Sequence, residues 1–183
     1  MDRFKFTEVP GNIFDYEGHY KIVHCTSSDF KCNSLFSSIV DNRYNIQEKL
    51  KESFPYERWR ERGYALYTPG VFTLITKFRW NDMVPAERMK EALESLKNLM
   101  IHYKINRVVL PRIEEDSLIW NDQSETCVHQ LISLVFGGFN LEVKVVYPPQ
   151  TKEDLSIIDP DLELIHFGEN RRSIDGNTTH KYY

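Results

Sequence analysis

Residues 106–111, NRVVLP, form the stretch that most constrains how this chain can fold. A run of consecutive apolar, β-branched residues is typical of a strand that is buried on both faces. Strands buried in this way belong mostly to parallel sheets, because the crossover connections between parallel strands place helices over the sheet. The run therefore predicts a strand inside a mostly parallel sheet with helices on both sides.

The remaining sequence supplies segments that fit such a sheet. Runs rich in β-branched and aromatic residues predict strands at 4–9, 21–25, 64–68, 71–76 and 141–148. Apolar residues at helical spacing predict helices at 34–54, as one helix or two short ones, at 84–103 and at 122–136. Pro69-Gly70 favours a turn, so the strands on either side of it are adjacent or form a hairpin. We expect an α/β fold of three layers, α/β/α, around a mostly parallel mixed sheet.

The pattern of apolar and polar residues changes after Pro148-Pro149. The 183 residues suit one domain, and strands and helices alternate up to this point. Beyond it the chain holds a single apolar cluster followed by a polar end. We expect one domain at 1–149 and an extension at 150–183, in which 150–168 packs on the domain and 169–183 is a mobile tail.

Charge and composition limit the kinds of partner. The formal net charge of −4 gives no general attraction to nucleic acid. No apolar run approaches the roughly 18 residues that span a bilayer, and the first residues lack the apolar core of a signal peptide. We expect an intracellular protein, cytoplasmic or nuclear, without membrane contact. Three cysteines without a CxxC pair favour neither a disulfide framework nor a metal site, and no cofactor is expected.

Polar segments follow three of the predicted strands. They are HCTSSDFKCNS at 24–34, TKFRWND at 76–82 and PRIEEDSLIW at 111–120. In open α/β sheets, ligands bind beyond the carboxyl ends of the strands. We therefore expect these loops to meet at one edge, with Lys77 and Asp116 in one cleft. The alternative is that Lys77 is a surface lysine and Asp116 a turn residue that caps the next helix, whereas His24 is expected to be a hydrogen-bonded core residue.

The order of several short motifs resembles the macro domain family. These motifs are PGNIFD, IVHCTSSDF, FTLITKFRW, VVLPRI, DSLIW and LEVKVVY, with a long amphipathic helix after the third. They look most like the branch that contains the terminal ADP-ribose protein glycohydrolase, in which one strand ends in LITK and a later one in PRI. The resemblance covers about residues 4–147 and implies recognition of ADP-ribose or of ADP-ribosylated protein.

The resemblance also implies roles for individual residues. Lys77 matches the lysine that attacks the anomeric carbon of ADP-ribose in this branch, and Asp116 matches its acid/base partner. Asn12 falls where many macro domains place an aspartate that binds the adenine amine, and an amide oxygen can accept that hydrogen bond too. The other residues implied to contact the ligand are Ile13, Ser27, Ser28, Asn33, Ser34, Arg112 and Ile113.

The chain departs from the family where the diphosphate is expected. Asn33 and Leu35 stand where glycines normally allow the backbone to approach the ligand closely. The second phosphate loop is shortened to Glu114-Glu115, whose carboxylates would repel a diphosphate. Binding of ADP-ribose with hydrolysis of ADP-ribosyl esters is therefore expected beside two alternatives. One is a catalytically degenerate module for protein interaction or regulation, with the extension as a docking segment, and the other is recognition of another nucleotide or an RNA end.

Overall fold

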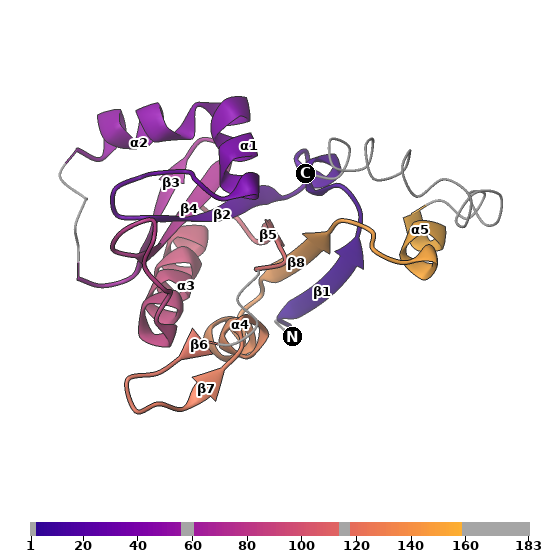
Figure 1. Cartoon of the computed structure of the whole chain (residues 1–183). Coiled ribbons are helices and arrows are strands. Elements are labelled where there is room, and N and C mark those ends of the chain that lie inside the picture. Colours follow the sequence, from indigo (N-terminus) through magenta and orange to yellow (C-terminus); the bar gives the residue numbers. More distant parts are fainter. Residues whose placement is uncertain (1–2, 56–60, 114–117, 159–183) are drawn as a thin grey trace.

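The computed structural model of the chain describes residues 3–55, 61–113 and 118–158, and six strands form its central sheet (Figure 1). The strand order is β1-β8-β5-β2-β4-β3. Neighbouring strands run parallel except β3, which is antiparallel to β4. The bounds are β1 (Lys5–Pro10), β2 (Lys21–Ser27), β3 (Tyr64–Thr68), β4 (Val71–Lys77), β5 (Arg107–Pro111) and β8 (Glu142–Tyr147).

The predicted inner strand lies where its sequence requires. β5 pairs with β8 on one side and with β2 on the other. Val108 and Leu110 join one apolar cluster, whereas Val109 joins the cluster on the opposite face of the sheet. This alternation explains the continuous apolar run, since both faces of the strand are covered.

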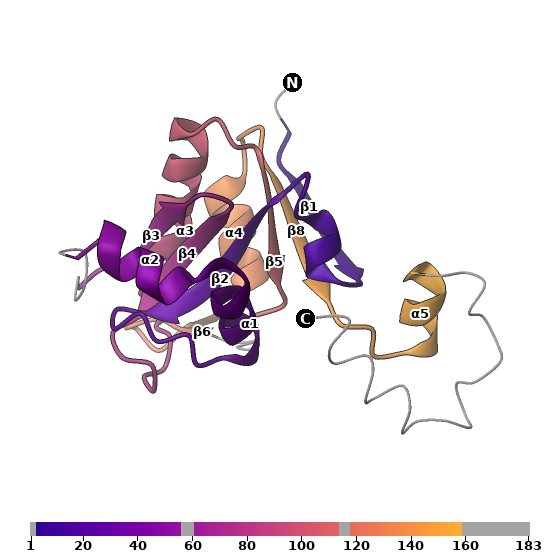
Figure 2. The same ribbon diagram turned by 90° about the horizontal axis from the view of Figure 1, so that it is seen from above.

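Helices cover both faces, so the fold has three layers (Figures 1 and 2). The two helices α3 (Ala86–His102) and α4 (Val128–Phe136) pack on one face. The opposite face carries α1 (Leu35–Tyr44), α2 (Ile46–Ser53) and the 3-10 helix η1 (Ile13–Tyr16). The expected α/β/α architecture with a mostly parallel mixed sheet is confirmed.

The segment predicted as one helix or two is divided at Asn45. This residue adopts a left-handed backbone conformation with φ 54° and ψ 48°, which asparagine tolerates better than most residues. Its N–H donates to the carbonyl of Asp41 at 2.7 Å, and the Asp41 carboxylate accepts the N–H of Gln47 at 2.7 Å. Asp41 therefore both closes α1 and opens α2.

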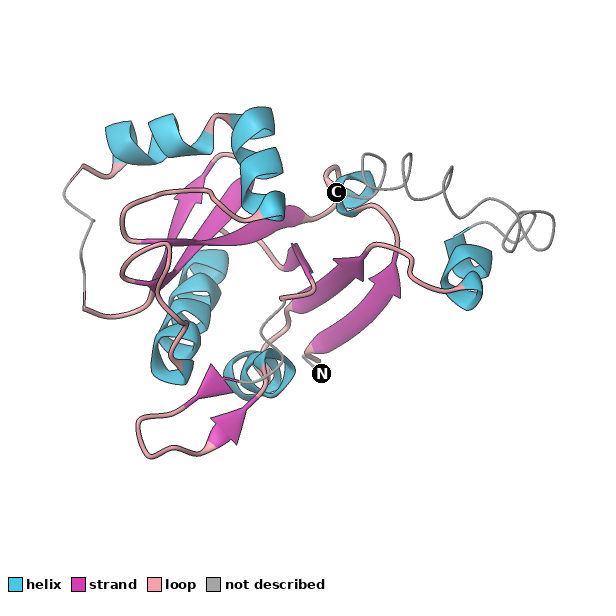
Figure 3. Ribbon diagram, viewed as in Figure 1, coloured by secondary structure: helices cyan, strands magenta, loops and turns pink. Residues whose placement is uncertain are grey.

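The helix predicted from residue 122 begins later, and this expectation is wrong at its start. Residues 118–126 instead contain the short antiparallel strands β6 (Leu118–Ile119) and β7 (Glu125–Thr126), drawn in magenta in Figure 3. The Asp122 carboxylate accepts the N–H of Ser124 at 2.9 Å and so stabilises a turn. The helix begins after Cys127, whose N–H donates to the Gln130 side chain at 3.1 Å.

Beyond β8 the structure describes one further helix, α5 (Lys152–Ile158). The Asp154 carboxylate accepts the N–H of Gln150 at 3.0 Å and the hydroxyl of Tyr147 at 3.3 Å, which ties α5 to the end of β8. No residue of α5 is fully buried. Residues 159–183, which include the predicted tail, lie outside the described residues. Within the described chain, no helix has the length and apolarity needed to cross a membrane.

A buried chain of hydrogen bonds links α1 to the sheet through His24, which is 1% exposed. Its Nδ1 lies 3.2 Å from the Ser37 Oγ on α1, and its Nε2 lies 2.7 Å from the Thr73 Oγ1 on β4. Burial lowers the pKa of His24 to about 4, although the negative charge of Asp41 opposes part of this shift. The expectation of a hydrogen-bonded core histidine is confirmed.

This burial makes stability depend on pH. Between about pH 6.5 and pH 4, His24 is protonated in the unfolded chain but stays neutral in the folded protein. The free energy of unfolding should therefore fall by up to about 3 kcal/mol as the pH is lowered through this range. Urea unfolding between pH 7 and pH 4 measures the slope. His24→Asn should lose that part of the slope, while carboxylate contributions common to both proteins cancel. Identical pH dependence in both proteins would contradict the buried neutral histidine.

Gly63 offers a second test of the packing between β3 and α3. A Cβ atom at this position would lie 1.9 Å from the carbonyl oxygen of Arg88, a backbone atom of α3. Gly63→Ala should therefore lower the free energy of unfolding by about 2–4 kcal/mol, because the helix must shift. Gly18→Ala is the matched control, since no atom lies within 4 Å of its added methyl group. Equal midpoints of denaturant unfolding in the two variants would show that the contact is absent.

Candidate functional site

A cleft of about 160 Å³ opens at the carboxyl edge of the sheet. Its walls come from the ends of β2 and β4, the first turn of α1, and residues 111–113 at the end of β5. The parallel pairing of β2 with both β4 and β5 places these segments at one edge. The structure brings four expected site residues together here: Ser34, Lys77, Arg112 and Ile113.

Lys77 ends β4 and lines the cleft together with its neighbour Thr76. Consecutive strand residues normally point to opposite faces. Here the pairing of β2 with β4 is irregular after Thr26, so that Ser27 lies opposite Lys77, and such bulges redirect side chains. No carboxylate among the described residues forms an ion pair with Lys77. The cleft therefore contains a positive charge that no described acidic group neutralises.

The first turn of α1 forms the facing wall. Ser34 is the N-cap, and its Oγ accepts the N–H of Ser37 at 3.1 Å. The amino end of a helix carries partial positive charge and N–H groups that favour anions. Leu35, the residue in place of an expected glycine, lines the same wall and is 58% exposed. The wall therefore combines a polarised helix end with an apolar side chain.

Arg112 also borders the cleft, but its charge is compensated. Its Nε donates to the Glu8 carboxylate at 2.7 Å, and its guanidinium lies 3.8 Å from the centre of the Tyr147 ring. Beyond Arg112 lies a second hollow of about 220 Å³ beneath the start of α4, with Phe6 and Ile132 among its apolar lining. Pro111, Arg112 and Ile113 therefore line both the cleft and the second hollow.

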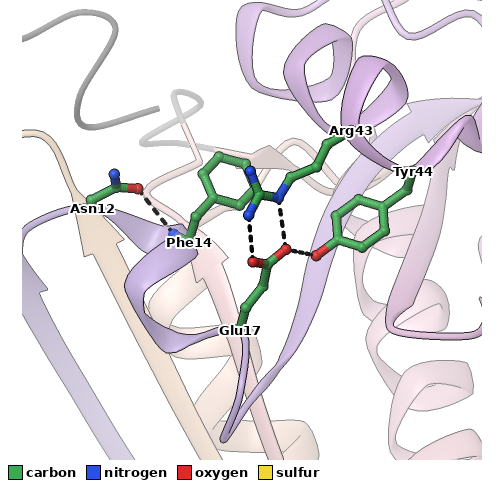
Figure 4. A network of polar contacts seen from close by, with 5 residues as sticks. All are labelled: Asn12, Phe14, Glu17, Arg43 and Tyr44. Carbon is green, nitrogen blue, oxygen red and sulfur yellow. Dashed lines mark hydrogen bonds and ion pairs between the residues drawn. The ribbon is translucent and has the colours of Figure 1, made fainter.

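Asn12 and Ile13 lie away from this cleft. The Asn12 side-chain oxygen accepts the N–H of Phe14 at 3.0 Å and so caps η1 (Figure 4). Ile13 is buried in the core beneath α1. The side-chain oxygen that was expected to bind adenine is therefore engaged in a local hydrogen bond.

An ion pair joins η1 to α1 next to Asn12. Arg43 donates two hydrogen bonds to Glu17, at 2.7 and 2.6 Å, and Tyr44 donates a third (Figure 4). The Arg43 bond is the main reason that the pKa of Glu17 is lowered. The Arg43 guanidinium also lies 4.7 Å from the centre of the Phe14 ring. The segment after β1 is therefore held against α1 by charge-assisted hydrogen bonds.

The remaining expected residues shape the connection between β2 and α1. The Ser27 hydroxyl donates to the Asp29 carboxylate, and the buried Ser28 donates its N–H to the Lys77 carbonyl at 2.9 Å. Asn33 is exposed. None of these three lines the cleft in the described structure. Asp116, like Glu114 and Glu115, lies outside the described residues, so its acid/base role stays a prediction.

Sequence reasoning missed several residues of the cleft wall. Cys25, Thr26, Ser37 and Thr76 line it, and none was named as a site residue, although all but Ser37 lie in segments expected at this edge. A signal for Ser37 exists, because a serine N-cap at Ser34 predicts where the first turn of a helix begins. Thr76 carries no comparable signal, since it lies at the irregularity in the pairing of β2 with β4.

Comparison with known proteins identifies the fold. No protein-family model and no curated protein sequence matches the chain. Among solved structures it is similar to the macrodomain of DarG from Thermus aquaticus, with a TM-score of 0.59 and 15% identity over 80% of this chain and 99% of that one. The macrodomain of Mycobacterium tuberculosis DarG gives a TM-score of 0.58 and 18% identity over 79% and 98% of the two chains.

A third similar structure is Thermosipho africanus DarTG, which was solved in complex with ADP-ribose. The TM-score is 0.60 at 12% identity, and the likeness covers 88% of this chain but 46% of that protein. Identities this low establish likeness of fold. The chain therefore has the macrodomain fold.

Proposed function

We propose that the cleft binds ADP-ribose or a closely related nucleotide. The observation that carries the proposal is the meeting of the α1 amino end with Lys77, which no described carboxylate pairs with, at the carboxyl edge of the sheet. Helix N–H groups and a lysine ammonium are the groups that proteins commonly use to bind phosphate. The fold agrees with this ligand, since Thermosipho africanus DarTG has a similar fold and was solved with ADP-ribose.

The size of the cleft limits how much of the ligand it encloses. Its volume of about 160 Å³ lies below the range of roughly 300–1,000 Å³ that is usual for small-molecule sites. The cleft suits a ribose and a phosphate, with the rest of the nucleotide lying across the surface. We expect an affinity in the micromolar range or weaker, because little of the ligand is buried.

We further propose that a bound ADP-ribosyl ester is hydrolysed. The Lys77 ammonium would first give a proton to Asp116. The resulting amine would attack the anomeric carbon, and the protein carboxylate would leave. Water would then attack the same carbon, release ADP-ribose and restore the lysine. Asp116 would transfer the protons in both steps. This proposal follows from the match of both residues to the macro domain branch and from the place of Lys77 in the cleft.

Exposed apolar side chains favour a second function, contact with a protein. Leu35, Trp80 and Met83 are 58%, 46% and 84% exposed. Leu35 lines the cleft, and Trp80 and Met83 belong to the loop between β4 and α3, which reaches the cleft at Val84. An ADP-ribosylated protein would place its own surface against this rim. The same rim would serve a catalytically inactive module, with the extension from residue 150 as a further docking segment.

Loss of the Lys77 charge tests nucleotide binding. Lys77→Ala should weaken ADP-ribose binding about tenfold, because a charge-assisted contact to phosphate is removed. Lys49→Ala is the matched control, since it removes the same charge from an exposed position on α2. Isothermal titration calorimetry at constant ionic strength measures both affinities. Absence of heat with millimolar ADP-ribose and wild-type protein would exclude the nucleotide site.

Hydrolysis is tested on a protein that carries glutamate-linked ADP-ribose. Lys77→Ala and Asp116→Asn should each lower the turnover rate by about a hundredfold or more, as expected when a nucleophile or a general acid is lost. Release of ADP-ribose, followed by mass spectrometry, provides the measurement. Wild-type binding without turnover would remove the enzymatic proposal and leave recognition alone.

A further inference from the structure

We propose that His24 is a positioning residue, which holds the first turn of α1 opposite Lys77 as a neutral imidazole with its proton on Nδ1. The positioning role rests on the proposed function of the cleft, whereas the location of the proton does not. His24 itself does not line the cleft, so its effect on a ligand passes through Ser37.

The location of the proton follows from counting donors. The Ser37 hydroxyl has one hydrogen, and it donates this hydrogen to the Cys25 carbonyl at 2.7 Å, which can act as acceptor alone. The Ser37 oxygen can therefore take part in the 3.2 Å contact with His24 Nδ1 only as the acceptor, so Nδ1 carries the proton. In the neutral ring Nε2 then has a lone pair, and the Thr73 hydroxyl donates to it at 2.7 Å.

These bonds form a directed chain from β4 to α1. Thr73 donates to His24, His24 donates to Ser37, and Ser37 donates to the carbonyl of β2. The Thr73, His24 and Ser37 side chains are all buried. Buried polar groups that are fully paired favour one arrangement strongly, because any other leaves a donor or acceptor without a partner.

The chain connects the two walls of the cleft. Ser37 lies in the first turn of α1, and its N–H donates to the N-cap Ser34, so fixing Ser37 fixes the helix end. Thr73 lies four positions before Lys77 in the same strand. His24 thus sets the position of the α1 N–H groups relative to the strand that presents the lysine ammonium. An apolar side chain of similar volume would fill the space, but it would form no hydrogen bonds that fix α1 relative to β4.

The state of the ring is tested first, in wild-type protein without ligand. Nitrogen-15 spectra of the imidazole should show Nδ1 protonated and Nε2 unprotonated, without change between about pH 5.5 and 8. A proton on Nε2, or titration near the ordinary histidine pKa of about 6.5, would overturn the proposal. This measurement requires no nucleotide.

The positioning role is tested with matched variants. His24→Asn places an amide nitrogen close to the Nδ1 position and should keep ADP-ribose affinity within about threefold, whereas His24→Leu should weaken it about tenfold. His24→Leu should also speed hydrogen exchange of the Ser37 and Ser38 amides, whose hydrogen bonds to Ser34 form the start of α1. Ser37→Ala is a milder variant that breaks the same link and should reproduce the loss of affinity. Met100→Ala is the stability control, because it removes a buried side chain of α3 on the opposite face of the sheet.

The outcomes separate this proposal from the proposed function. If wild-type protein does not bind ADP-ribose, the proposed function fails, while the ring spectra and the exchange at Ser37 and Ser38 still decide whether His24 holds the helix end. If wild-type protein binds, equal affinity in wild type, His24→Leu and Ser37→Ala would overturn the positioning role. An equal loss in Met100→Ala would assign the effect to general destabilisation and overturn it as well.

Discussion

The parallel pairing of β2 with β4 and β5 is the constraint on which the candidate site depends. Parallel strands end at the same edge of a sheet, so three connections that are distant in sequence open toward one place. That pairing requires cover on both faces, and the apolar clusters beneath α3 and α4 and beneath α1 and α2 provide it. The cleft is therefore a consequence of how the core is covered, while its chemistry depends on the loops.

The charges around the cleft differ in whether they are already paired. Arg112 binds Glu8, and Arg43 binds Glu17, so these guanidinium groups hold elements of the fold together. Lys77 forms no ion pair within the described residues, and it ends β4, a strand that is paired on both sides. Within the described residues, a ligand that contacts Lys77 therefore does not first have to break an ion pair. This difference distinguishes Lys77 from Arg112, the other cationic residue that lines the cleft.

The sequence was sufficient for the architecture because burial leaves a periodic pattern. The run at 106–111 and the helical spacing at 84–103 correspond to β5 and α3, since each segment contacts the core along a regular face. The residues 118–126 escaped prediction because their small hairpin depends on the turn at Asp122 rather than on periodicity. The residues of the site likewise divide into those with a sequence signal and those whose position depends on local geometry. Lys77 could be placed from the end of its strand and Ser34 from the family resemblance, whereas Thr76 lines the cleft beside an irregularity in strand pairing that no residue type predicts.

Asn12 shows why a residue at a family motif position can have a different role from the one that the family implies. An amide oxygen can accept an adenine amine, and it can equally cap a short helix, as it does for the N–H of Phe14. The Glu17–Arg43 contact holds η1 against α1 and so keeps that capping geometry in place. The same reasoning applies to Leu35, where a side chain replaces an expected glycine but the helix end behind it is retained. The cleft thus combines a polarised helix end with Lys77, while Asn12 and Leu35 do not provide the contacts expected of a site that encloses a nucleotide. Under the proposed function, this favours a shallow site whose selectivity comes from the protein surface beside it.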